Sequence, residues 1–187
     1  MSDEWRTFLW TADEFLIEYS LPLPFLTAVK QFLIGHVVEL YLKAAYTKMT
    51  GDHRSAINYG HKIKNLLGAC QKHTPSFMQG YQIKDDVFNS IKSNQIVNDP
   101  EYFKHCQLYQ IAVWAGRFKY FGMPQSIDGT EKQTSFICMW PDPYWTGFLK
   151  ELRTYLGYPE EGKGDRIKHM WNQLPESSKV YLLDLYS

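Results

Sequence analysis

The stretch from Phe25 to Met49 constrains the fold more than any other part of the chain, because it is apolar around most of a helical circumference. Its apolar residues form two adjacent stripes, the first made by Leu26, Val29, Leu33, Val37, Leu40 and Ala44 and the second by Phe32, Ile34, Val38 and Leu42. A helix that is apolar nearly all round is buried among other helices. Gly51 is placed to end it. We therefore predict a central helix over residues 25–49.

Apolar residues at three- and four-residue intervals predict further helices on both sides of this one. The predicted helices are 5–19, 63–70, a weaker one over 83–91, one over 100–121 that begins at the start signal Asn98-Asp99-Pro100-Glu101, 145–156, and two short terminal helices, 167–174 and 178–185. Residues 52–59 are polar and predict a loop, and residues 135–140 predict one short extended piece without an evident partner strand. We expect an all-α fold, an antiparallel up-and-down helical bundle in a single domain spanning residues 1–187, with additional short C-terminal helices.

Charge and cysteine content limit the compartment and the partners of the chain. Lys plus Arg and Asp plus Glu each total 20, and this balance argues against gripping duplex nucleic acid by its phosphates as a main activity. The cysteines, Cys70, Cys106 and Cys138, are scattered and odd in number, which is typical of reduced thiols. The acidic N-terminus lacks the pattern of a signal peptide, and polar residues interrupt every long apolar stretch. These features predict a soluble, cytoplasmic protein without a membrane span.

His36, Glu39 and Lys43 form a polar wedge on the otherwise apolar helix over residues 25–49. At about 100° per residue, the three side chains fall within roughly 60° of one another and border the apolar stripe. Buried charges need partners, and Glu39 and Lys43 have the favourable four-residue spacing with the acid first. One interpretation is a structural ion pair that fixes helix packing. The other is a polar pocket that receives an anionic or nucleotide-like ligand.

A second informative segment is Tyr59-Gly60-His61-Lys62-Ile63, which leads into the predicted helix over residues 63–70. Gly60 permits a sharp entry, and His61 stands where the free N–H groups of a helix start favour anions. A histidine here can also bond a neighbouring helix for structural reasons.

The two segments together resemble the HEPN (higher eukaryotes and prokaryotes nucleotide-binding) domain family. The stretch HVVELYLKAAY is similar to the family's H/A-x-x-E-x-x-x-K helix, and YGHKIKNLL to the Gly-His dipeptide that opens its next helix. AGRFKYFGMP, with Arg117 and Tyr120, is similar to the Arg-Tyr-rich end of a later helix. The resemblance covers about residues 24–124 and leaves 125–187 as a C-terminal helical extension. It implies an antiparallel bundle, often a homodimer, that binds a nucleotide or RNA, beside a partner such as a nucleotidyltransferase.

Many HEPN proteins are metal-independent ribonucleases with an Arg-x(4–6)-His motif in a late helix. In them the resemblance implies that the His assists attack by the ribose 2′-hydroxyl and that the Arg stabilises the developing charge. Here no His follows Arg117 until His169, whereas Arg54 and His61 are separated by six residues but lie in a different part of the chain. The first hypothesis is therefore a non-catalytic binding module with a pocket lined by His36, Glu39, Lys43, His61, Arg117 and Tyr120. The alternative is a ribonuclease with a displaced motif drawn from His61, Arg54 and Arg117.

Other kinds of site have weaker support in the sequence. Cys70 and His73 have the spacing C-x-x-H, but no second pair stands at zinc-ligand spacing, so neither a metal nor another cofactor is predicted. Trp140, Tyr144 and Trp145 cluster around two prolines. They can cover the end of a bundle, or they can form an aromatic surface for another protein. The second possibility gives a third hypothesis, a structural interaction module that uses its aromatic C-terminal part.

Overall fold

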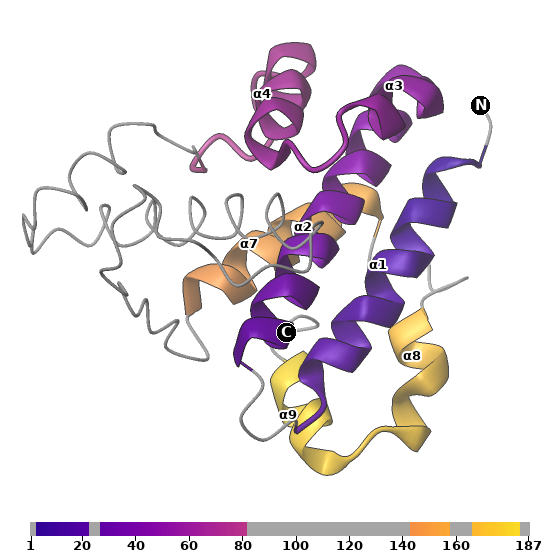
Figure 1. Ribbon diagram of the computed structural model, residues 1–187, viewed down its shortest axis with the longest axis vertical. Coiled ribbons are helices and arrows are strands. Elements are labelled where there is room, and N and C mark those ends of the chain that lie inside the picture. The colour runs from indigo at the N-terminus through magenta and orange to yellow at the C-terminus, as the bar shows by residue number, and fades with distance from the viewer. Residues whose placement is uncertain (1–2, 23–26, 82–142, 158–165, 184–187) are drawn as a thin grey trace, which may run out of the picture.

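The computed structural model describes residues 3–22, 27–81, 143–157 and 166–183, and within these ranges the secondary structure is entirely helical (Figure 1). The elements are α1 (Trp5–Ser20), α2 (Thr27–Thr50), α3 (His53–Asn58), α4 (Ile63–His73), α7 (Pro143–Leu156), α8 (Arg166–Met170), the 3-10 turn η2 (Trp171–Gln173) and α9 (Glu176–Leu183). The all-α prediction is thus confirmed for the described residues. No helix in these ranges is both long enough and apolar enough to cross a membrane.

The central position of α2 follows from its sequence. From Leu33 to Ala45 every residue except His36 is buried, so packing partners surround the helix, as the apolar pattern predicts. The helix ends at Thr50, and Gly51 follows with a φ of +73°, a left-handed conformation that glycine adopts without strain. The Gly51 N–H donates to the Thr47 carbonyl at 2.8 Å and satisfies one group at the helix end.

Helix α1 lies alongside α2 and runs in the opposite direction (Figure 1). It buries one face toward α2, including Leu9, Ala12 and Leu16, and ends where the chain becomes extended at Leu21. Pro22 follows directly, and a residue before a proline is disfavoured in helical conformation. The predicted first helix is therefore confirmed.

The predicted loop over residues 52–59 is wrong, because residues 53–58 form the short helix α3. The Asp52 side chain caps it by accepting a hydrogen bond from the Ser55 N–H at 2.8 Å. Ala56 is the residue that α3 buries. A helix this short shows no apolar periodicity, so only its cap was visible in the sequence.

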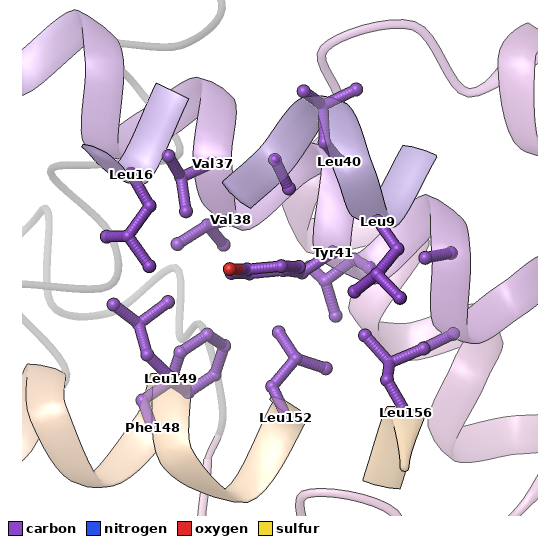
Figure 2. Close-up of a cluster of buried hydrophobic side chains, with 14 of the residues drawn as sticks. Leu9, Leu16, Val37, Val38, Leu40, Tyr41, Phe148, Leu149, Leu152 and Leu156 are labelled. Atoms are coloured by element: carbon purple, nitrogen blue, oxygen red, sulfur yellow. The ribbon is translucent and has the colours of Figure 1, made fainter. Parts of the chain in front are cut away.

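Helix α4 agrees with prediction, because Ile63, Leu66, Leu67 and Cys70 are all buried and Thr74 ends the helix. The helices from the C-terminal part pack onto the same core: Phe148, Leu149, Leu152 and Leu156 of α7 are buried, as are Ile167, Leu174 and Leu182 from the segment 166–183. Figure 2 shows the ring of Tyr41 lying between Leu16 and Val38 on one side and the leucines of α7 on the other. The predicted helix over 145–156 is confirmed as α7, and the one over 178–185 is confirmed as α9 up to Leu183, the last described residue. The predicted helix over 167–174 is instead the short helix α8 followed by the 3-10 turn η2.

A buried polar cluster made by Asp13 of α1, Tyr41 of α2 and Arg153 of α7 joins these three helices. Arg153 Nη1 donates to Asp13 Oδ1 and to the Tyr41 hydroxyl, and that hydroxyl donates to Asp13 Oδ1, each at 2.5 Å. All three residues are at most 1% exposed. Burial raises the pKa of the Tyr41 hydroxyl well above its usual value, so the hydroxyl stays a hydrogen-bond donor. The cluster is sealed from solvent, and its hydrogen bonds connect α1, α2 and α7.

Several predicted features lie outside the described residues. They are the helices over 83–91 and 100–121, the extended piece over 135–140, and the side chains of Arg117, Tyr120, Trp140, Tyr144 and Trp145. These stay predictions.

Candidate functional site

The candidate site is centred on the Glu39 carboxylate, which receives polar contacts from three other side chains. Lys43 Nζ donates to Glu39 Oε1 at 2.6 Å. His61 Nδ1 lies 2.7 Å from Glu39 Oε2, and His36 Nδ1 lies 3.8 Å from the same oxygen. One buried carboxylate thus gathers one ammonium and two imidazoles. We call these four residues the Glu39 cluster.

The local backbone explains why the four side chains meet. His36, Glu39 and Lys43 stand three and four residues apart on α2, so they lie one above another on one side of the helix. His61 arrives from the turn between α3 and α4, where Gly60 has a φ of +56° and permits the sharp entry that its sequence context predicts. An edge-on contact between the rings of Tyr46 and Tyr59, with centroids 5.4 Å apart, holds this turn against α2.

The exposed fraction falls steeply from the edge of the cluster to its centre. The side chains of Glu39 and Lys43 are 1% and 9% exposed, whereas those of His36 and His61 are 24% and 35% exposed. A ligand from solvent therefore meets the imidazoles first, with the carboxylate and the ammonium behind them. The rim is also aromatic, since the Phe15 ring contacts His36 edge-on with centroids 4.7 Å apart.

The electrostatics of the cluster keep Glu39 ionised. Burial, the largest single influence, acts to raise the pKa of its carboxyl, but the contacts with His36, Lys43 and His61 and the charge of Lys43 together outweigh it. The net effect lowers the pKa from 4.5 to about 2. At neutral pH the ionised carboxylate can therefore accept a hydrogen bond from the Nδ1–H of His61, an arrangement that orients the ring and leaves its Nε2 available to a ligand.

The structure brings together four of the six residues predicted to line the pocket, His36, Glu39, Lys43 and His61. The other two, Arg117 and Tyr120, lie outside the described residues. Arg54, the alternative catalytic arginine, is exposed on α3, and no ion pair or side-chain hydrogen bond joins it to His61 in the described part of the chain.

A pocket of about 490 Å³ lies elsewhere, between the segment after α4 and helix α7. It is lined by Thr74, Ser76, Phe77, Met78, Gly147, Lys150, Glu151, Thr154 and Tyr155, none of which the sequence indicated. Its wall includes Phe77 and Tyr155, whose rings are in edge-on contact with centroids 4.8 Å apart. Among the described residues its lining includes no histidine or cysteine, unlike the Glu39 cluster.

The Glu39 cluster contains the one group of His, Cys, Asp or Glu side chains, among the described residues, that is arranged to hold a metal ion: His36, Glu39 and His61. One ligand atom of each lies within 4.8 Å of the others. The sequence predicts these three residues as lining a pocket but not as metal ligands, because closely spaced Cys and His pairs are the usual signal of a metal site and His61 lies 22 residues after Glu39. The same arrangement can also bind an anion through the imidazoles.

Sequence reasoning also missed the buried cluster of Asp13, Tyr41 and Arg153. A signal for it exists: Asp13 has Leu9, Leu16 and Ile17 at helical spacing, and Arg153 has Leu149 and Leu156, so each charge interrupts an apolar face. A charged side chain on an apolar helix face is buried, and it destabilises the fold strongly unless a charge of opposite sign pairs with it.

Comparison of this chain with protein-family models, with curated proteins and with solved structures finds no match in any of the three.

Proposed function

We propose that the protein is a HEPN-like helical module that binds the phosphate group of a nucleotide or of single-stranded RNA at the exposed edge of the Glu39 cluster. The observation that carries this proposal is the contact of 2.7 Å between His61 and Glu39. It unites the two parts of the motif on which the resemblance rests, the helix with Glu39 and Lys43 and the Gly-His dipeptide, in one site. In this proposal residues 24–124 form an antiparallel bundle, and Arg117 and Tyr120 complete the pocket.

The surroundings of His61 favour an anionic ligand. Lys62 is exposed next to it, and Arg54 is exposed on the neighbouring helix α3. Helix α4 begins directly after Lys62, its N-cap residue, whose side chain makes no capping hydrogen bond. The first N–H groups of a helix lack partners within the helix and carry a partial positive charge, which a phosphate neutralises. The chain is neutral as a whole, so this cationic edge is a local feature.

Titration of the metal-free protein with ATP and with an unstructured oligoribonucleotide tests the proposal. We expect His61→Gln to weaken binding about 10-fold or more, because a hydrogen bond to a charged group contributes roughly 1.5–3 kcal/mol. Lys62→Ala should also reduce the slope of log affinity against log salt concentration by about 1, the amount expected for the loss of one phosphate contact. His73→Gln, at an exposed histidine of α4 outside the cluster, is the matched control and should bind normally. Equal affinity of the His61 variant and the control contradicts the proposal.

A second candidate function is metal-independent RNA cleavage, favoured by the way Glu39 holds His61. A carboxylate at Nδ1 orients an imidazole so that its Nε2 can act as a general base, and it stabilises the ring once protonated. Incubation with mixed RNA in EDTA distinguishes cleavage from binding, because cleavage by 2′-hydroxyl attack leaves 2′,3′-cyclic phosphate ends. The candidate requires that His61→Ala abolish such products, and cleavage that survives this substitution excludes His61 as the base.

The proposed assembly is a homodimer beside a protein partner such as a nucleotidyltransferase, as the resemblance implies. Light scattering of the full chain measures the assembly directly. A monomer at micromolar concentration contradicts the dimer and leaves the ligand proposal intact.

A further inference from the structure

We propose that His36, Glu39 and His61 form a binding site for one divalent ion of the zinc type. Two imidazole nitrogens and one carboxylate oxygen converge there from two parts of the chain, with Nδ1 of His61 at 2.7 Å and Nδ1 of His36 at 3.8 Å from Glu39 Oε2. This inference does not rest on the proposed nucleotide binding, because it needs only these three side chains.

The distances fit an ion after a small adjustment. Zinc bonds to nitrogen and oxygen of about 2.0–2.2 Å place neighbouring ligand atoms of a tetrahedral site roughly 3.4 Å apart. The ligand atoms of the three residues all lie within 4.8 Å of one another, so shifts of the partly exposed imidazoles are enough to reach this spacing. His36 and Glu39 are three residues apart on α2, a spacing at which a histidine and a glutamate of one helix bind the same metal centre in helical bundles.

The donor set selects the class of ion. Two imidazoles and one carboxylate suit Zn²⁺, Co²⁺ or Ni²⁺, whereas Mg²⁺ and Ca²⁺ prefer oxygen ligands only. Three protein ligands leave a fourth position of a tetrahedral site open, and the exposed fractions of His36 and His61, 24% and 35%, place that position toward solvent. His61 needs no net loss of a proton in this process, because a neutral imidazole can bind the ion through Nδ1 and carry its hydrogen on Nε2.

Lys43 has two opposing effects on such a site. It bonds Glu39 Oε1, so it orients the carboxylate and leaves Oε2 for the ion. Its ammonium also repels a cation bound to the same carboxylate. The repulsion acts between full charges at a buried carboxylate, so we expect it to outweigh the loss of one orienting hydrogen bond. Replacing Lys43 by the uncharged, unbranched Met should then tighten metal binding, whereas a purely structural role of the cluster predicts no such gain.

Calorimetric titration of EDTA-stripped, full-length protein with Zn²⁺ tests the inference, together with the visible absorption of the Co²⁺ complex. We expect one ion per chain and an intense absorption band typical of tetrahedral Co²⁺. His36→Gln and His61→Gln should each lower the affinity at least 10-fold, and His73→Gln should leave it unchanged. Circular dichroism confirms that each variant keeps its helices, which is expected because both imidazoles are partly exposed.

Three results would each overturn the inference. The first is the absence of stoichiometric Zn²⁺ binding, and the second is binding that the double variant His36→Gln, His61→Gln retains. The third is an affinity of Lys43→Met for Zn²⁺ that is equal to or weaker than that of the unsubstituted chain, where an increase of at least 10-fold is expected. These titrations contain no nucleotide, and the nucleotide titrations contain no metal, so either proposal can fail alone.

Discussion

Removing one charge from the buried cluster of Asp13, Tyr41 and Arg153 should destabilise the protein severely. Asp13 and Arg153 are 0% and 1% exposed, and the ion pair between them joins α1 to α7. Breaking a buried pair costs about 3–5 kcal/mol, because the remaining charge is left without its partner in a medium that solvates it poorly. We therefore expect Asp13→Asn and Arg153→Met each to lower the free energy of unfolding by about 4 kcal/mol, a large part of the roughly 5–15 kcal/mol of a typical domain.

The double variant separates the net contribution of the ion pair to the free energy of unfolding from the cost of leaving one buried charge without a partner. Once Arg153 is Met, changing Asp13 to Asn removes a buried, uncompensated charge, so the second substitution costs little or is favourable. We expect Asp13→Asn, Arg153→Met to cost at most about 4–5 kcal/mol in total, well below the sum of the two single changes, since residues in one buried network couple strongly. Tyr41→Phe removes only the hydroxyl and leaves the direct bond from Arg153 to Asp13. It should cost about 1.5–3 kcal/mol, as expected for hydrogen bonds to charged groups.

Urea unfolding at pH 7, followed by circular dichroism, measures these differences. The matched control is the exposed pair Glu14 and Arg166, which also joins α1 to a C-terminal helix but at 3.9 Å and with side chains 59% and 47% exposed. Breaking it with Glu14→Gln should cost less than about 1 kcal/mol. The reasoning is refuted if Asp13→Asn costs no more than Glu14→Gln, or if the effects of Asp13→Asn and Arg153→Met simply add.

Three further predictions concern the Glu39 cluster and its surroundings. Folding lowers the pKa of Glu39 from 4.5 to about 2. At 1.36 kcal/mol per pKa unit, the ionised carboxylate contributes roughly 3 kcal/mol to the free energy of unfolding. This contribution is complete above pH 4.5 and is lost as the pH falls toward 2. Urea unfolding in EDTA should show that Glu39→Gln is less stable than the unsubstituted chain at pH 7 and that its stability falls less than that of the unsubstituted chain between pH 4.5 and 2. The control Glu18→Gln, at an exposed position of α1, should keep the pH profile of the unsubstituted chain. Burial raises the pKa of the Cys70 thiol to about 12, so Ellman's reagent should react with Cys70 only when the protein unfolds. Comparison with the variant Cys70→Ala shows which part of the thiol reaction belongs to Cys70. Rapid reaction of Cys70 in the native state contradicts this burial. Gly60→Ala should cost about 1 kcal/mol because of its φ of +56°, a conformation that L side chains rarely adopt. In the described part of the chain no atom beyond the two neighbouring residues lies within 4 Å of the added Cβ, so the cost is conformational, and thermal unfolding that shows no loss contradicts it.

The helices that could be predicted from the sequence are those whose burial leaves a periodic trace. Helix α2 is surrounded by other helices, and α4 buries one stripe, so their apolar residues alone reveal them. Helix α3 has a single buried residue, Ala56, and its only sequence signal is the capping side chain of Asp52, so a polar loop was the natural but wrong prediction. Predicting elements by periodicity therefore fails where a helix is held by its cap and its neighbours and not by its own apolar face.

The candidate site was predictable where the helix geometry alone brings residues together. The spacing of His36, Glu39 and Lys43 places them on one side of α2, and the contact of Lys43 with Glu39 at 2.6 Å agrees with that prediction. The contact of His61 with Glu39 depends on how α4 packs against α2, which no local pattern specifies. The ion pair of Asp13 and Arg153 spans 140 residues of sequence and joins two helices that the pattern could predict but not pair.

Helix α2 separates the Glu39 cluster from the buried cluster of Asp13, Tyr41 and Arg153 by its own geometry. Glu39 and Tyr41 are two residues apart, which turns their side chains about 200° from each other around the helix axis. Tyr41 therefore faces α1 and α7, where the polar cluster is sealed, and Glu39 faces the turn before α4, where His36 and His61 extend the cluster to solvent. A sealed cluster can only stabilise the fold, whereas one with imidazoles at the surface can also exchange its partners for a ligand. Helix α2 thus carries polar side chains on two opposite sides of an otherwise apolar surface. One side connects it to α1 and α7, and the other forms the candidate binding site.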